Sequence, residues 1–220
     1  MRNGLSRAVS PAGAPSFSVT REVAPAFHPA ATGPAWANLL EQFYAQGGVP
    51  FPQLHRLADS QLPEPYKSLL AHCADMTPTL EKFYARTVGI QVLNHQLHAD
   101  RYLREVVLQV PGPKGRGSLL PIEYGVIRIF LDRLPAPARR RVLQQERPFG
   151  KILREENIVH SSWPQDFFRI EADARLAALL RTGGEAPLYG RRNLLLDGAR
   201  HVLAEVIEIL APVDQNDLSR

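Results

Sequence analysis

The stretch LYGRRNLLLDGARHVLAEVIEIL, residues 188–210, predicts two adjacent antiparallel strands. Its arms, residues 188–196 and 200–210, are rich in leucine, valine and isoleucine, which pack well on a pleated sheet. Asp197-Gly198 lies between the arms, and this dipeptide is a strong hairpin signal because it tolerates the positive φ of tight turns. We therefore expect the C-terminal part of the chain to contribute a β-hairpin to an antiparallel sheet.

Further predicted strands precede this hairpin. Residues 88–98 alternate between apolar and polar side chains, and residues 102–110 (YLREVVLQV) and 119–131 are rich in strand-forming residues. The segment PGPKGRG at 111–117 lies between the last two and predicts a hairpin loop. Residues 164–171 form a further candidate strand. Most of the sheet is thus expected from residue 88 onward.

Apolar residues at helical spacing predict several helices before and between these strands. Thr77-Pro78 predicts a helix start, with the threonine as N-cap and the proline at the first helical position. The pattern indicates an α+β fold with a single antiparallel sheet of about six strands and helices packed on one side. The other predicted helices cover residues 34–46, 64–73, 135–145, 148–153 and 173–181.

Length and composition indicate one folded domain with an N-terminal extension. Hydrophobic residues make up 45% of the 220 residues, enough for a sizeable core. Residues 1–33 are rich in Pro, Ala and Ser without a periodic apolar face, which predicts a disordered extension before a domain over residues 34–220. No apolar run approaches the roughly 18 residues that cross a bilayer. With Cys73 as the only cysteine, we expect a cytoplasmic protein without a membrane partner.

Charge and residue spacing argue against nucleic-acid and metal binding. The formal net charge is +4, of which residues 1–33 carry +2, and the remaining excess is too dispersed for a nucleic-acid footprint. The basic run Arg139–Arg141 lies in a predicted helix, where a solvated face is the ordinary interpretation. His95 and His98 are three apart on a strand and point to opposite faces, so they cannot bind one ion. We expect no metal and no cofactor.

Arg104 is a candidate binding residue. It lies in the middle of a strand whose other residues indicate burial, and a buried guanidinium requires an anion. One interpretation is a structural pair with Glu105, Glu123 or another acid on a strand. The other is a clamp for a substrate carboxylate, to which arginine offers two parallel hydrogen bonds.

Glu205 and Glu208 are candidate acid/base residues on the last strand. Both stand among apolar neighbours, and burial raises the pKa of a glutamate toward the range useful in proton transfer. Their opposite parity places them on opposite faces of the sheet. Periodicity alone does not decide which of the two faces the interior.

Five segments resemble motifs of the chorismate lyase family, in the family's order, across residues 60–212. The closest is YLREVVL at 102–108, which is similar to the family's strand WLREILL. The other four are DMTPTLE at 75–81, Asp132–Pro135 with PFGKIL at 148–153, LYGRR at 188–192, and Asp197-Gly198 with the strand to Glu205.

This resemblance implies a chorismate pyruvate-lyase, which converts chorismate to 4-hydroxybenzoate and pyruvate without a cofactor. It implies a six-stranded antiparallel sheet with helices on one side, and a monomer whose partners are this substrate and this product. Matched residue by residue, Arg104 would bind the substrate carboxylate and Glu205 would be the catalytic acid or base. The backbone beside Phe149 and Gly150 would contact the ligand, with phenylalanine in place of the family's leucine.

Three alternatives accompany this interpretation. Counting back from Pro212 instead of forward from Gly198 assigns the family glutamate to Glu208. The same general fold resembles the effector-binding domains of certain bacterial transcription regulators, which bind a small molecule without catalysis. A lyase acting on a related enolpyruvyl or aromatic acid is the third, and Phe149 favours it by reshaping the pocket wall.

Overall fold

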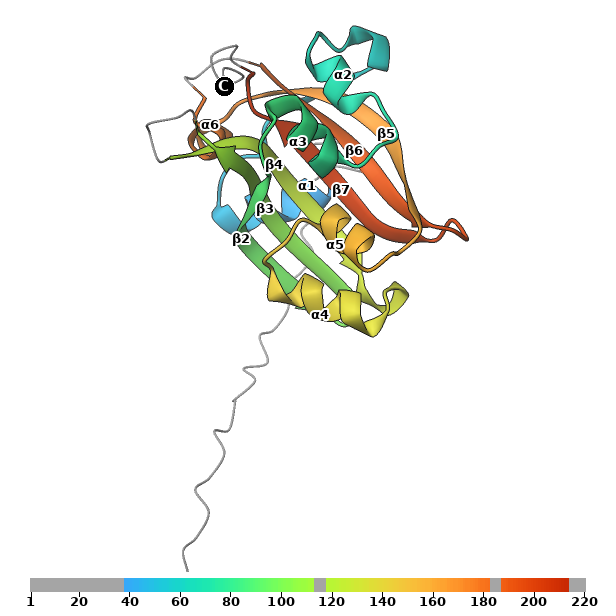
Figure 1. Cartoon of the computed structure of the whole chain (residues 1–220). Coiled ribbons are helices and arrows are strands. Elements are labelled where there is room, and N and C mark those ends of the chain that lie inside the picture. The colour runs from blue at the N-terminus through green and yellow to red at the C-terminus, as the bar shows by residue number, and fades with distance from the viewer. Residues whose placement is uncertain (1–37, 113–117, 183–186, 214–220) are drawn as a thin grey trace, which may run out of the picture. The chain divides into compact units, whose positions relative to one another are not determined.

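The computed structural model describes residues 38–112, 118–182 and 187–213, and they form a single antiparallel sheet with six α-helices. The sheet has seven strands in the order β1-β5-β6-β7-β4-β3-β2 (Figure 1). This confirms the α+β prediction. The strands are β1 (Leu54–Leu57), β2 (Gly89–His98), β3 (Arg101–Pro111), β4 (Leu119–Phe130), β5 (His160–Glu171), β6 (Pro187–Asp197) and β7 (Val202–Leu210).

Two strand meanders meet at the centre of the sheet. Strands β2, β3 and β4 are consecutive neighbours, as are β5, β6 and β7, and the pairing of β4 with β7 joins the two groups. The predicted β6–β7 hairpin is confirmed. Asp197 closes its loop by accepting hydrogen bonds from the N–H groups of Ala199 and His201, at 2.9 and 2.8 Å. The positive φ of 67° falls on Arg200, whereas the sequence pattern had assigned the turn to Asp197-Gly198.

The seventh strand was not expected from the sequence. Residues 54–57 were assigned to no helix or strand, because four residues are too few to show a period. In the structure they pair antiparallel with β5, from Leu54 opposite Ile170 to Leu57 opposite Phe167. The short strand β1 thereby forms one edge of the sheet.

Helices cover both faces of the sheet, where the sequence had predicted only one. Helices α1 and α6 pack on one face and contribute Leu40, Phe43 and Leu176 to its core. Helices α2 to α5 lie on the other face (Figure 1). Strand β3 is buried at every position from Tyr102 to Leu108, a pattern that requires cover on both sides. The helices are α1 (Asn38–Gly47), α2 (Tyr66–Leu70), α3 (Met76–Tyr84), α4 (Ala136–Gln144), α5 (Phe149–Glu155) and α6 (Ala174–Leu180).

Helix α3 begins before the predicted position. Asp75 is its N-cap residue and Met76 its first helical residue, so Thr77 lies inside the helix rather than capping it. Thr79 donates to the carbonyl of Asp75 at 2.9 Å. This shift by two residues matters for the site described below, because it places the Asp75–Thr77 backbone over the sheet.

Among the described residues, no helix is long and apolar enough to cross a membrane. The predicted extension over residues 1–33, its boundary at residue 34 and most of the predicted loop at 111–117 lie outside the described ranges. They remain predictions.

Candidate functional site

The candidate site is built on the register of four neighbouring strands, β3, β4, β7 and β6. Residues directly opposite one another on adjacent strands project to the same face of the sheet, so the register brings side chains from distant parts of the chain into rows. Rows on one face are about 7 Å apart, since two residues of a strand separate them. Three such rows face helices α2 to α5: Arg104–Ile127–Val206–Asn193, Val106–Gly125–Glu208–Arg191, and Leu108–Glu123–Leu210–Tyr189.

A pocket lies on these rows, beneath the first turns of α3 and α5. It contains about 560 Å³ of space, part of which is open to solvent. Gly125 stands at its centre, and the missing side chain leaves the floor hollow. An added Cβ there would come within 3.2 Å of Val106 Cγ2 and 3.3 Å of Glu123 Oε1. The roof consists of Asp75, Met76 and Thr77 from the start of α3 with Pro148, Phe149 and Gly150 from the start of α5.

Arg104 lies in the pocket wall and lacks an acidic partner among the described residues. It is 1% exposed, and its guanidinium makes one hydrogen bond, from Nη2 to the carbonyl of Arg147 at 3.2 Å. Within the described part of the chain, Nε and Nη1 have no hydrogen-bond acceptor. Burial lowers the pKa of Arg104 to about 10, so the group remains a cation at neutral pH. A buried cation with two free donors is suited to hold an anion.

The structural pairing that the sequence offered for Arg104 is not observed. Glu105 projects to the opposite face, where it accepts a hydrogen bond from the Tyr124 hydroxyl at 2.6 Å and pairs with Arg175. Glu123 lines the same pocket as Arg104 but forms no ion pair with it. The guanidinium therefore faces the cavity without a carboxylate from the described chain.

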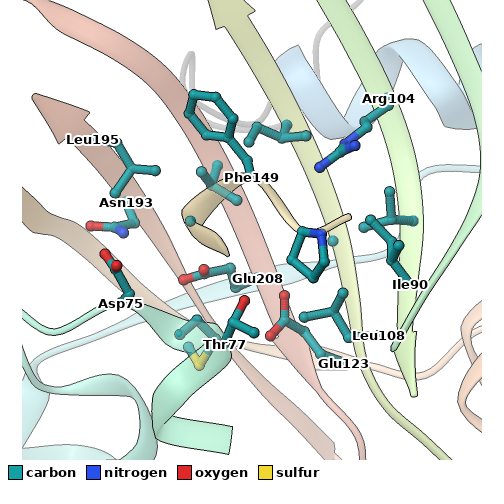
Figure 2. Close-up of a pocket in the computed structure, with 17 residues that line it drawn as sticks. Asp75, Thr77, Ile90, Arg104, Leu108, Glu123, Phe149, Asn193, Leu195 and Glu208 are labelled. Carbon is teal, nitrogen blue, oxygen red and sulfur yellow. The ribbon is translucent and has the colours of Figure 1, made fainter. Parts of the chain in front are cut away.

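The end of the pocket away from Arg104 carries two carboxyl groups, and a second buried arginine, Arg191, contacts one of them. Glu208 lines the pocket and accepts from Nε of Arg191 at 2.5 Å. Arg191 is fully buried and is fixed further by the carbonyls of Leu70 and His72, each 2.9 Å from its Nη1. Figure 2 shows the carboxyl groups of Glu123 and Glu208 on the pocket floor, apart from the Arg104 guanidinium. The cavity is thus cationic at one end and acidic at the other.

Glu205, which the hairpin count assigned to the site, does not line this pocket. Glu205 pairs in register with Arg128 and Leu194, on the face of the sheet opposite the pocket. There it accepts from Arg192 at 2.8 Å and from Arg128 at 3.0 Å. Glu205 and Glu208 are three positions apart on the strand, and side chains an odd number of positions apart point to opposite faces. Only Glu208 therefore reaches the pocket face.

Phe149 and Gly150, which the sequence analysis named as ligand contacts, both line the pocket at the start of α5. Phe149 is 4% exposed and packs into the apolar cluster below α4 and α5. Next to them, Asp75 binds His160 Nε2 through both carboxylate oxygens, at 3.0 and 3.1 Å. This contact ties the start of α3 to β5 at the rim of the site. The ligand-binding roles of Arg104, Phe149 and Gly150 remain predictions.

The pocket residues that were not identified from the sequence as members of the site include Glu123, Asn193 and Gly125. Glu123 had been considered only as a partner for Arg104. Glu123 lies two residues before Gly125, on a strand whose only other charged residue is Arg128. This position was the available indication of a buried carboxyl group at a hollow in the sheet. Asn193 donates to Ser162 Oγ at 2.8 Å and leaves its side-chain oxygen without a partner in the described ranges.

The histidines that were considered for metal binding lie apart from this pocket. His95 and His98 are exposed on the edge strand β2. In the described ranges, no group of three or more His, Cys, Asp or Glu side chains is arranged to hold a metal ion.

Comparison with known proteins assigns no family to this chain. No family model matches it and no curated protein matches it. Among solved structures, it is similar to PhnF from Mycobacterium smegmatis at 13% identity over 79% of this chain and 93% of that one, with a TM-score of 0.49. The effector domain of the same PhnF matches at 15% identity over 62% and 88%, with a TM-score of 0.46. A GntR-family transcriptional regulator from Bacillus cereus matches at 8% identity over 57% and 92%, with a TM-score of 0.39. Sequence identities and TM-scores this low do not indicate the function of this chain.

Proposed function

We propose that the pocket binds a small cyclic carboxylic acid whose carboxylate is held by Arg104. The observation that carries this proposal is the buried guanidinium, whose Nε and Nη1 nitrogens have no hydrogen-bond acceptor and which has no carboxylate partner in the described chain. Leaving a buried charge uncompensated is costly, whereas a bound carboxylate compensates the charge and accepts two hydrogen bonds at once.

The rest of the pocket suits a ring. Its walls between Arg104 and the acidic end are apolar, which favours burial of a flat hydrocarbon skeleton over a sugar or a phosphate ester. At the far end, Glu208 and Glu123 offer hydrogen bonds to a ring substituent. The apolar wall is formed by Ile90, Val106, Leu108, Ile127, Phe149, Leu195 and Val206.

The finer proposal is that chorismate is the ligand and that the chain is a chorismate pyruvate-lyase. In this reaction the ring C–O bond to the enolpyruvyl group breaks, the neighbouring ring carbon loses its proton, and the diene becomes aromatic. The products are 4-hydroxybenzoate and enolpyruvate, which tautomerises to pyruvate. Aromatisation supplies the driving force, so that the chain needs to position the substrate and move one proton.

In this proposal Glu208 replaces Glu205 as the carboxylate that handles the ring proton. Glu208 lies in the same pocket as Arg104, two strands away and two residues further along the sheet. A substrate clamped by Arg104 at its carboxylate would present its opposite ring edge toward Glu208. Arg191 would orient the Glu208 carboxylate through the 2.5 Å contact.

A second candidate is a binding domain without catalysis, and one observation favours it. Glu208 is already engaged by the buried Arg191, an arrangement that by itself stabilises the folded sheet. In such a domain the same contacts would hold a carboxylic acid such as 4-hydroxybenzoate, and no proton would be transferred.

One experiment separates these candidates. The purified protein is incubated with chorismate, 4-hydroxybenzoate and pyruvate are followed by mass spectrometry, and 4-hydroxybenzoate binding is measured by calorimetry. Equal release of both products that is lost in Arg104→Gln supports the lyase. Binding of 4-hydroxybenzoate without product release supports the binding domain.

Arg128→Gln is the matched control, because Arg128 lies on the opposite face of β4 and pairs with Glu205. It should change neither readout. Absence of both binding and turnover in the wild-type protein would contradict the carboxylic-acid site as a whole.

A further inference from the structure

Glu123 is a buried acid in the pocket that the proposed reaction does not use. It lies on β4, directly opposite Leu108 and Leu210, and is 3% exposed. Its Oε2 is buried and has no hydrogen-bond partner in the described residues. A buried carboxyl oxygen without a hydrogen-bond partner is unfavourable unless a ligand meets it.

The surrounding charges are already balanced without Glu123. Glu208 is compensated by Arg191, and Asp75 is engaged by His160 and lies 3.7 Å from Arg154. Arg104 faces the other end of the cavity. An ionised Glu123 would therefore add a buried negative charge next to Glu208, with only Arg191 to serve two carboxylates.

Burial raises the pKa of Glu123 well above its ordinary value, and the neighbouring Glu208 charge raises it further, while Arg191 acts in the opposite sense. A raised pKa keeps Glu123 neutral, in agreement with the balance of the surrounding charges described above. A neutral carboxyl group carries a hydroxyl hydrogen, so Glu123 can donate a hydrogen bond as well as accept one.

We propose that Glu123 is a protonated specificity residue that donates a hydrogen bond to a hydroxyl group on the ring of the bound carboxylic acid. This inference rests on the proposed carboxylic-acid site. Glu208, as a carboxylate, only accepts, and Glu123, as a neutral acid, donates. A ring hydroxyl satisfies both at once, because it donates to Glu208 and accepts from Glu123.

Other substituents at this end satisfy only part of the arrangement. An aromatic amino group donates to Glu208 but is a poor acceptor for Glu123. A hydrogen atom leaves both carboxyl groups without a partner. A second carboxylate would lie next to Glu208 with no further cation among the pocket-lining residues that the structure describes. At this end the pocket is therefore selective for a hydroxyl group on the ring of the bound carboxylic acid.

The test compares affinities for 4-hydroxybenzoate, 4-aminobenzoate and benzoate by calorimetry in the wild-type protein, Glu123→Gln and Glu123→Leu. The wild type should bind 4-hydroxybenzoate about tenfold more tightly than 4-aminobenzoate, the value of one good hydrogen bond. Glu123→Leu should abolish this preference and leave the affinity for benzoate within about threefold. Glu123→Gln should keep most of the preference, since its amide still donates.

Glu205→Gln is the matched control, because it removes a carboxylate of the same sheet on the opposite face. It should leave the preference unchanged. A preference that survives in Glu123→Leu, or that Glu123→Gln loses as completely as Glu123→Leu does, would overturn the inference while the site itself stands. If the wild type binds none of the three acids, the carboxylic-acid site fails, and the inference fails with it.

A second measurement does not depend on the leucine variant folding. The infrared difference spectrum between wild type and Glu123→Gln at neutral pH should contain the C=O stretch of a neutral carboxylic acid in the wild type only. Carboxylate bands in its place would show an ionised Glu123 and overturn the inference.

Discussion

Glu208 on β7 pairs in register with Gly125 on β4, and both residues line the pocket. This single relationship joins the hollow in the sheet to its acidic end. It arises because β7, the last strand of the chain, inserts beside β4 rather than at an edge. The site therefore forms only when both meanders of the sheet have assembled.

Replacing Gly125 with valine should fill this hollow. Even a single Cβ would lie 3.2 Å from Val106 Cγ2 and 3.3 Å from Glu123 Oε1, closer than ordinary contacts. We expect Gly125→Val to weaken 4-hydroxybenzoate binding by at least about tenfold and to destabilise the fold by about 1–3 kcal/mol through overpacking. Calorimetry and thermal denaturation check both effects, and Gly125→Ala should give smaller changes of the same sign. Unchanged affinity in the valine variant would place the ligand elsewhere.

Replacing Arg104 with glutamine should remove ligand binding without harming the fold. Loss of a charge-assisted contact to a carboxylate costs on the order of 2–5 kcal/mol, so the affinity should fall about 30-fold or more. Because the free protein loses an uncompensated buried cation, its melting temperature should stay the same or rise. Arg128→Gln serves as the control in the same assays. A marked drop in the melting temperature of Arg104→Gln would instead show a structural role.

The two glutamates of β7 should behave differently when each is replaced by glutamine. We expect Glu208→Gln to lower kcat on chorismate by about a hundredfold or more, in line with loss of a general acid or base. Glu205→Gln, on the opposite face, should change kcat little. Both variants are assayed with initial-rate measurements of 4-hydroxybenzoate release. The reverse pattern would reinstate Glu205 and contradict the placement of the site on this face.

The contact between His160 and Asp75 should make part of the stability depend on pH. The hydrogen bond to Asp75 is the main cause that raises the pKa of His160 above its ordinary 6.5. The folded state thus binds the proton more tightly than the unfolded state. The contribution of the His160–Asp75 contact to the free energy of unfolding is complete below about pH 6.5. It is lost as the pH rises through the folded-state pKa of His160. His160→Gln should therefore melt below the wild type at about pH 5.5, and the difference should shrink by about pH 8.5. A difference that does not vary with pH would contradict this.

Local patterns in the sequence predicted much of the fold. The alternation in residues 88–98, the apolar arms around Asp197-Gly198 and the helical spacing in residues 135–145 each involve neighbours within a few positions, so the chain itself carries that information. Arg104 could be singled out for the same reason, as a charge within an apolar strand. Strand β3 has apolar residues of both parities, such as Val106 and Val107, which also indicated cover on both faces, although we predicted helices on only one.

The composition of the pocket was decided by the tertiary structure. Which glutamate of β7 faces the cavity depends on how that strand pairs with β4, and the sequence counts from Gly198 and from Pro212 gave different answers. The absence of an acid beside Arg104, the buried ion pair of Glu208 with Arg191 and the unpartnered Glu123 depend on strand register and on which helix turns lie above it. A sequence pattern shows which residues of a strand share a face. A shift of one residue in the strand register exchanges the two faces, and the sequence does not exclude it. The register that removes this ambiguity is set by contacts between segments far apart in the sequence, such as Leu70 and Arg191, which are 121 positions apart.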